Sequence, residues 1–144
     1  MDPYVVDTSI VVKWLNTKDE NFVSQAQRLL HDAQLEEISL FTPDLAVYEL
    51  SNALLKGKKL AAAEVYEGFT KLLALPVAIV SYSTAIVLRA ASFAEQYNLS
   101  VYDATFLAFA AIKRCPLITE NVRHQGIVKE IEVMHIKDYP LSSL

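Results

Sequence analysis

The chain of 144 residues is poor in cysteine, glycine and proline, with one, three and five of them respectively. The single cysteine, Cys115, excludes an intramolecular disulfide and suits a reducing compartment. So few glycines and prolines argue against a β fold that needs many tight turns. The longest apolar run, Phe106 to Ile112, is too short to span a bilayer, and Met1–Tyr4 has no signal-peptide character. We therefore expect a cytoplasmic protein without a membrane segment.

Several chemical signatures are also missing. Neither GxxxxGK[ST] nor GxGxxG occurs, so the usual phosphate-binding loops are excluded, and no GxSxG serine-hydrolase elbow is present. The residue two places after Asp7 is Ser9, which excludes a DxD start of the haloacid-dehalogenase type. The histidines show no zinc-type spacing with one another or with Cys115: they are His31, His124 and His135.

The composition is that of a soluble globular domain. Hydrophobic residues make up 53% and charged residues 21% of the chain, which is enough for a buried core and a polar surface. We expect one domain over residues 1–144. The net charge of −4 is unfavourable for gripping nucleic acid by bulk charge. Either nucleic acid is irrelevant, or the acids gather at a site where bound cations reverse the local charge.

Strand-like and helix-like segments alternate along the chain. Strands are predicted at residues 4–6, 38–41, 77–80, 117–119 and 133–136. Helices are predicted at residues 22–33, from a Thr42 N-cap and Pro43 to about 56, at 61–75, 83–97 and 103–113, and weakly from 121. This alternation indicates an α/β fold, a three-layer α/β/α sandwich around a mainly parallel sheet of four or five strands. In such sheets, sites form at the carboxyl ends of the strands.

Three acids occupy positions where they could carry chemistry. Asp7 directly follows the first strand, Glu49 lies on a polar stripe of a mostly apolar helix with Asn52 and Lys56, and Asp103 begins the most apolar helix. Taken singly, each has a structural interpretation: a helix cap for Asp7 and Asp103, and a solvated stripe for Glu49. Taken together, they could converge at one end of the sheet. Carboxylates that close repel unless a cation lies between them, and oxygen ligands favour Mg²⁺ or Mn²⁺.

Four segments, in order and at suitable spacing, resemble a known family. They are 5–14 (VVDTSIVVKW), 43–54 (PDLAVYELSNAL), 101–108 (VYDATFLA) and 117–121 (LITEN). They look like the motifs of PIN domains, specifically the VapC-type toxins of prokaryotic toxin–antitoxin pairs. In the fourth segment the family usually shows Thr-x-Asp, whereas this chain has Thr119-Glu120-Asn121. The resemblance covers nearly the whole chain.

The resemblance implies a metal-dependent endoribonuclease that hydrolyses RNA phosphodiester bonds with metal-activated water. Asp7, Glu49 and Asp103 would bind Mg²⁺ or Mn²⁺. The implied partners are an RNA substrate, a small antitoxin protein and a second copy of the chain in a homodimer. The resemblance also implies polar groups beside the acids or in contact with substrate, at Thr8, Ser9 and Thr119.

Asn121 stands at the fourth acidic position. Its amide oxygen can ligate a metal but brings no charge, so a second metal is doubtful, whereas neighbouring Glu120 should point elsewhere. Asp44 is better explained as a first-turn helix anion. Two alternatives therefore stay open: a weak or inactive PIN domain that binds RNA or a protein, and a phosphatase or DNA nuclease on this scaffold. Candidate RNA-contacting cations are Lys13, Lys56, Lys58, Lys59 and Arg123.

Overall fold

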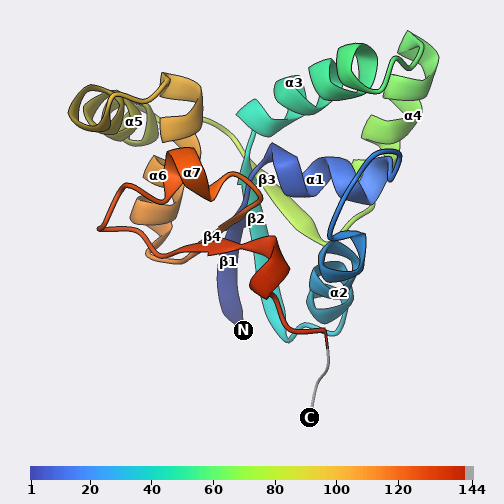
Figure 1. Ribbon diagram of the computed structural model, residues 1–144, viewed down its shortest axis with the longest axis horizontal. Helices are drawn as coiled ribbons and strands as arrows, with labels where there is room; N and C mark the ends of the chain where they lie inside the picture. The colour runs from blue at the N-terminus through green and yellow to red at the C-terminus, as the bar shows by residue number, and fades with distance from the viewer. Residues whose placement is uncertain (142–144) are drawn as a thin grey trace.

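The computed structural model describes residues 1–141. Its centre is a five-stranded sheet in the order β3-β2-β1-β4-β5, in which every neighbouring pair is parallel (Figure 1). The predicted α/β sandwich with a parallel sheet is confirmed. The prediction of one domain over residues 1–144 stays a prediction, because residues 142–144 lie outside the described part. The strands are β1 (Asp2–Val6), β2 (Ile38–Pro43), β3 (Val77–Val80), β4 (Leu117–Thr119) and β5 (Val133–His135).

Helices cover both faces of this sheet (Figure 1). None of those in the described residues combines the length and apolar character that crossing a membrane requires. The α-helices are α1 (Thr8–Leu15), α2 (Val23–Gln34), α3 (Leu45–Asn52), α4 (Ala62–Leu73), α5 (Thr84–Tyr97), α6 (Val101–Lys113) and α7 (Val122–Gln125). A π-helix, η1 (Ala53–Gly57), continues α3, and a 3-10 helix, η2 (Ile136–Asp138), follows β5.

Two apolar cores fill the space between the layers. Successive residues of a strand point to opposite faces, so Val5 joins the core under α5 and α6, whereas Val6 joins the core under α1, α2 and α4. Leu117 and Ile118 of β4 divide in the same way. The central strands are therefore buried on both sides, as expected for a parallel sheet covered by helices.

Two predicted helix starts are wrong. Thr42 and Pro43 belong to β2, because the parallel pairing with β3 continues through both residues, and the Thr42 hydroxyl donates to the Val6 carbonyl at 2.8 Å. Sheet pairing overrides the local Thr-Pro start signal, and α3 begins at Leu45. Helix α6 begins at Val101 rather than Asp103, and Ser100 caps it by accepting the N–H of Asp103 at 3.0 Å.

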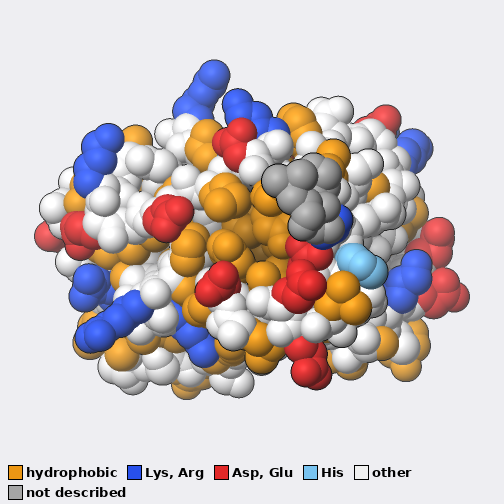
Figure 2. Space-filling view, turned by 90° about the horizontal axis from the view of Figure 1, so that it is seen from below, with side chains coloured by type: hydrophobic (Ala, Val, Ile, Leu, Met, Phe, Trp, Pro, Cys, Tyr) orange, Lys and Arg blue, Asp and Glu red, His pale blue; other side chains and the backbone are white. Residues whose placement is uncertain are grey.

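The two ends of the sheet differ in character. Asp7 and the helices that start near it lie at the carboxyl ends of the strands, away from the N-terminus (Figure 1). Figure 2 views the molecule from the N-terminal side, where hydrophobic side chains gather around a central hollow. A pocket there, at the start of β2 and β3, is lined mainly by apolar residues, among them Ile38, Phe41, Leu75 and Val77. The polar residues singled out in the sequence occupy the other end.

Candidate active site

Asp7 is held in place where β1 turns into α1. It is the N-cap of α1 and only 6% exposed. Its Oδ1 accepts the backbone N–H of Ser9 at 3.1 Å and the Ser9 hydroxyl at 2.5 Å, and its Oδ2 accepts the Thr119 hydroxyl at 2.6 Å. Ser9 and Thr119, expected beside the acids or the substrate, are thus in direct contact with this carboxylate.

Glu49 approaches from a different layer. It lies on α3, and its Oε1 accepts the hydroxyl of Thr8 at 2.7 Å. Thr8 is the first residue of α1, so this bond joins α3 to the turn that carries Asp7. Thr8 therefore also contacts one of the predicted acids.

Asp103 comes from the opposite face of the sheet, on the first turn of α6. It is the third residue of the helix and not its cap, so the cap interpretation from the sequence is wrong. A carboxylate in the first turn is favoured by the helix dipole, and the cap itself is supplied by Ser100. The position leaves the Asp103 side chain available for a ligand.

One pocket of about 320 Å³ joins these residues. It includes all three predicted acids together with Asn121, while Thr119 lies beneath, fully buried. The helical spacing of the sequence places Asn52 on the face of Glu49, but no pattern in the sequence indicates Phe106 or Gln125 as pocket residues. The lining residues are Asp7, Thr8, Ser9, Glu49, Asn52, Ala53, Asp103, Phe106, Asn121 and Gln125.

The negative charges of the acids in this pocket are not offset by any basic side chain that the structure describes. Burial raises the pKa of Asp7 to about 6, against the lowering effect of its hydrogen bonds, and the negative charge of Glu49 adds to the rise. Burial also raises the pKa of Glu49, with a further contribution from Asp103. Within the described part of the chain, none of the ion pairs includes Asp7, Glu49 or Asp103. The pocket therefore concentrates negative charge without a cationic side chain.

These residues fit a hard divalent cation by donor chemistry. Their ligand atoms are carboxylate, amide and hydroxyl oxygens, which Mg²⁺ and Mn²⁺ prefer. A cation would also stabilise the desolvated carboxylates of Asp7 and Glu49. Among the described residues, which leave out the side chain of His124, no group of three or more His, Cys, Asp or Glu side chains is arranged to hold a metal ion. Asp7, Glu49 and Asp103 line one pocket without forming a ready-made ligand cluster, and the Asn121 amide is a further oxygen donor beside them.

The segment after β4 keeps Glu120 out of the pocket. Its carboxylate binds the Lys13 ammonium at 2.9 Å, as expected for a residue that points elsewhere, and its backbone N–H donates to the Ser9 hydroxyl at 3.0 Å. The N–H of Asn121 donates to the Thr119 hydroxyl at 2.8 Å. Asp44 lies apart, with Oδ2 accepting the N–H of Tyr82 at 3.2 Å.

The prediction that Lys13 contacts RNA is wrong. Its side chain is fully buried, and its ammonium binds Glu20 and Glu120 at 2.9 Å each and the carbonyl of Asn21 at 2.7 Å. Lys58 shares Glu20 with it at 2.6 Å and is nearly buried. The ammonium groups of both lysines are therefore paired within the protein and are not available to bind RNA. Lys56, Lys59 and Arg123 are exposed.

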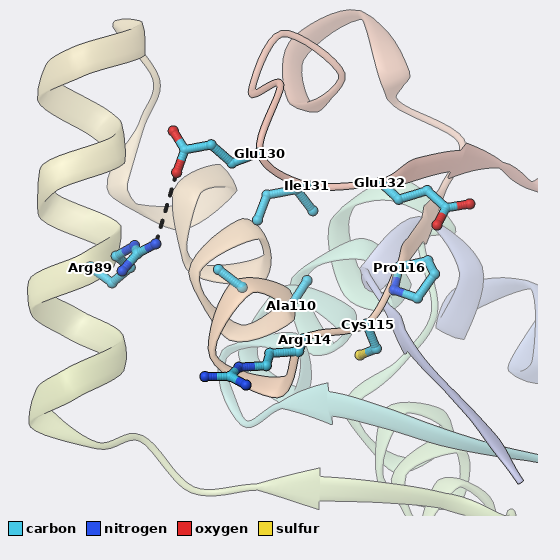
Figure 3. A pocket seen from close by; sticks show the side chains of 9 residues that line it. Arg89, Ala110, Arg114, Cys115, Pro116, Glu130, Ile131 and Glu132 are labelled. Carbon is cyan, nitrogen blue, oxygen red and sulfur yellow. Dashed lines mark ion pairs between the residues drawn. The ribbon is translucent and has the colours of Figure 1, made fainter.

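A second pocket of about 370 Å³ lies at the other end of α6 (Figure 3). Arg89 and Glu130 face each other across it at 3.8 Å, and Arg114 and Cys115 line its lower side. Its charges are mixed and exposed, and it contains none of the predicted site residues. The pocket with Asp7 is therefore the candidate active site.

Comparison with known proteins agrees with this geometry. The PIN domain family model matches residues 4–129, whereas curated proteins gave no match. VapBC2 from Rickettsia felis bound to a promoter DNA fragment has a TM-score of 0.70 at 17% identity, over 92% of this chain and 98% of that chain. VapBC-1 from nontypeable Haemophilus influenzae has a TM-score of 0.69 at 17% identity, over 94% of this chain and 99% of that chain. The sarcin–ricin loop cleaving toxin VapC20 from Mycobacterium tuberculosis has a TM-score of 0.64 at 16% identity, over 81% of this chain and 87% of that chain. At these low sequence identities, the structural similarity establishes the fold alone.

Proposed function

The chain belongs to the PIN domain family, and we propose that it is a Mg²⁺- or Mn²⁺-dependent endoribonuclease. One observation carries this proposal. Asp7, Glu49 and Asp103, from three separate elements, line one pocket without a cationic partner among the described residues. Such a site suits a reaction in which a cation and a phosphodiester enter together.

In the proposed reaction, Asp7, Glu49 and Asp103 would hold the ion together with the Asn121 amide. When bound, the ion supplies Lewis-acid activation of water and offsets the charge that develops on the phosphate. Ser9 and Thr119 fix the orientation of the Asp7 carboxylate through their hydroxyls. Thr8 does the same for Glu49, because its hydroxyl donates to Oε1 of that carboxylate at 2.7 Å.

The biological role we propose is that of the toxin in a toxin–antitoxin pair. Support comes from the structural neighbours, which include VapBC proteins of Rickettsia felis and Haemophilus influenzae and a toxin of Mycobacterium tuberculosis that cleaves the sarcin–ricin loop. The partners would be an RNA substrate, a small antitoxin protein and a second copy of the chain. We propose that the protein acts in the cytoplasm.

A second candidate function rests on Asn121. An amide there supplies no charge, so the site has three carboxylates where the family usually has four. A PIN domain with weakened metal binding could bind RNA or a partner protein without cutting. The two candidates differ in one measurable property, which is whether the protein cleaves the RNA that it binds.

A cleavage assay separates them. The purified protein is incubated with labelled RNA and DNA of the same sequence, in Mg²⁺, in Mn²⁺ and in chelator. We expect cuts in RNA only with metal present, and at least a hundredfold slower cutting by Glu49→Gln. Glu95→Gln, the same change at an exposed residue of α5, should cut like the wild type. Binding of RNA without cleavage in any metal would favour the second candidate, and cleavage of DNA alone would contradict the first.

The toxin role needs its own test. A short antitoxin gene directly upstream, and growth arrest on expression that co-expression of its product relieves, would support the proposed role. Growth that is unaffected by an active ribonuclease would contradict it.

A further inference from the structure

Gln125 is a buried amide in the wall of the candidate active site. It is the last residue of α7, it is 1% exposed, and it lines the same pocket as Asp7, Glu49 and Asp103. Neither the family motifs nor the cleavage chemistry proposed above uses it. Its burial in a four-residue helix therefore calls for a reason.

The amide is underused within the protein. Its Nε2 donates to the carbonyl of Asp103 at 3.4 Å, which is long for a hydrogen bond. Its Oε1 is the one buried side-chain oxygen or nitrogen atom of the described residues without a hydrogen-bond partner. Buried polar atoms are nearly always satisfied in native proteins, because an unmade hydrogen bond destabilises the fold. A ligand that donates a hydrogen bond would satisfy this one.

The chemistry of the pocket limits what that ligand group can be. Ionised carboxylates only accept hydrogen bonds, so Asp7, Glu49 and Asp103 cannot supply the donor. A phosphodiester also only accepts. In RNA, the 2′-hydroxyl is a donor on the sugar carbon next to the one that carries the 3′-phosphate, and DNA lacks it. The hydroxyls of Thr8 and Ser9 already donate to Glu49 and Asp7, and no described side chain is bonded to Oε1 of Gln125. Because Gln125 lines the same pocket as the acids, the sugar of a phosphodiester bound there would bring a donor to it.

We propose that the Gln125 carbonyl oxygen accepts a hydrogen bond from the ribose 2′-hydroxyl and so makes the site distinguish RNA from DNA. This inference rests on the proposed function. The last side-chain torsion of glutamine is broad, so the amide can turn its oxygen toward the pocket when substrate enters. Gln125 is thus a residue for substrate specificity, in addition to the acids.

The test combines a change in the protein with a change in the substrate. Gln125→Met keeps the length of the side chain and removes the acceptor, and Gln27→Met makes the same change at an exposed position of α2. The substrates are one RNA and two versions with 2′-deoxy or 2′-fluoro at the nucleotide on the 5′ side of the cut. We expect the wild type and Gln27→Met to prefer the hydroxyl by roughly five- to tenfold in kcat/KM, the effect of one neutral hydrogen bond. Gln125→Met should cut all three within about twofold, at the deoxy rate of the wild type.

Stability gives an independent readout. Removing an unsatisfied buried oxygen should raise the melting temperature of the metal-free protein, whereas loss of a structural hydrogen bond would lower it. A lower melting temperature with equal losses of kcat/KM on all substrates would overturn the proposal. So would a hydroxyl preference that survives in Gln125→Met.

A binding measurement separates this proposal from the proposed function. Fluorescence anisotropy in Ca²⁺ compares RNA with DNA of the same sequence. The wild type should bind RNA more tightly, and Gln125→Met should bind both alike. A wild type that cuts neither the RNA nor the DNA would contradict the proposed ribonuclease activity. The binding comparison would then still decide the role of Gln125. Equal binding of RNA and DNA by the wild type would overturn that role.

Discussion

Thr119 donates a hydrogen bond of 2.6 Å to Oδ2 of Asp7, although 112 positions separate the two residues in the chain. Ser9 holds the other oxygen of the same carboxylate. The orientation of Asp7 is thus set jointly by the first turn of α1 and by the end of β4, which pairs with β1 in the sheet. A carboxylate has lone pairs beyond those that the hydroxyls use, so a fixed Asp7 can still ligate a cation.

Asp7→Asn should abolish RNA cleavage and stabilise the metal-free protein. Burial raises the pKa of Asp7 from 3.8 to about 6, and one pKa unit corresponds to about 1.4 kcal/mol. Weaker hydrogen bonds to Ser9 and Thr119 offset part of this gain, so we expect a net rise on the order of 1 kcal/mol in the free energy of unfolding. Urea unfolding in chelator near pH 7.5 measures it. Unchanged cleavage at saturating Mg²⁺ would show that Asp7 does not bind the metal.

The same group makes the stability of the metal-free protein depend on pH. The folded protein holds the Asp7 proton more tightly than the unfolded chain does. The stability that protonated Asp7 contributes is therefore fully present below about pH 4 and is lost as the pH rises through about 6. Glu49 shifts in the same direction. Wild type in chelator should be more stable near pH 5 than near pH 7.5, and this difference should shrink in Asp7→Asn. An equal pH dependence in both proteins would exclude Asp7 as its source.

Asn121→Asp tests whether the fourth position belongs to the site. Asn121 lines the pocket of the three acids, so a carboxylate there should raise Mn²⁺ affinity roughly ten- to a hundredfold. The added repulsion should lower the stability of the metal-free protein. Isothermal titration and thermal melts measure the two effects, which should have opposite signs. No change in either quantity would place Asn121 outside the metal site.

Lys13→Met should destabilise the protein strongly. It leaves Glu120 without its ammonium and Glu20 with Lys58 alone, and removing one member of a buried ion pair costs roughly 3–5 kcal/mol. Lys56→Met, at an exposed position of η1, should change the free energy of unfolding by less than about 0.5 kcal/mol. Chemical denaturation compares the two variants. Equal, small effects would show that the buried charge network contributes little.

Much of this architecture could be predicted from hydrophobic patterning. The five strands and most helices lie within a few residues of their expected places, because alternating β and α runs are long enough to show their period. Asp7, Glu49 and Asp103 could be singled out because each stands at a strand end or on a helix with a clear pattern. That they share a pocket required the structure.

The remaining features depend on contacts between distant parts of the chain. Lys13 is the one charged residue of α1, a largely apolar helix, and nothing near it in sequence shows that Glu120 is its partner. Gln125 belongs to a helix too short for a period, so its burial could not be read from spacing. Thr42 and Pro43 carry a good local helix-start signal, which pairing between β2 and β3 overrides.

The π-helix η1 gives the α3 segment a wide turn, in which the N–H of Lys58 bonds to the carbonyl of Ala53 at 2.9 Å. Such a turn holds one surplus residue compared with an α-helix. Glu49 lies before it and points to the pocket, whereas Leu54 within it is buried in the core. Because this one turn absorbs the surplus residue, deleting one residue from positions 55–57 should restore α-helical spacing while Glu49, which lies before the turn, keeps its place. The segment after Glu49 can therefore gain or lose a residue at this turn without moving the carboxylate that faces the pocket.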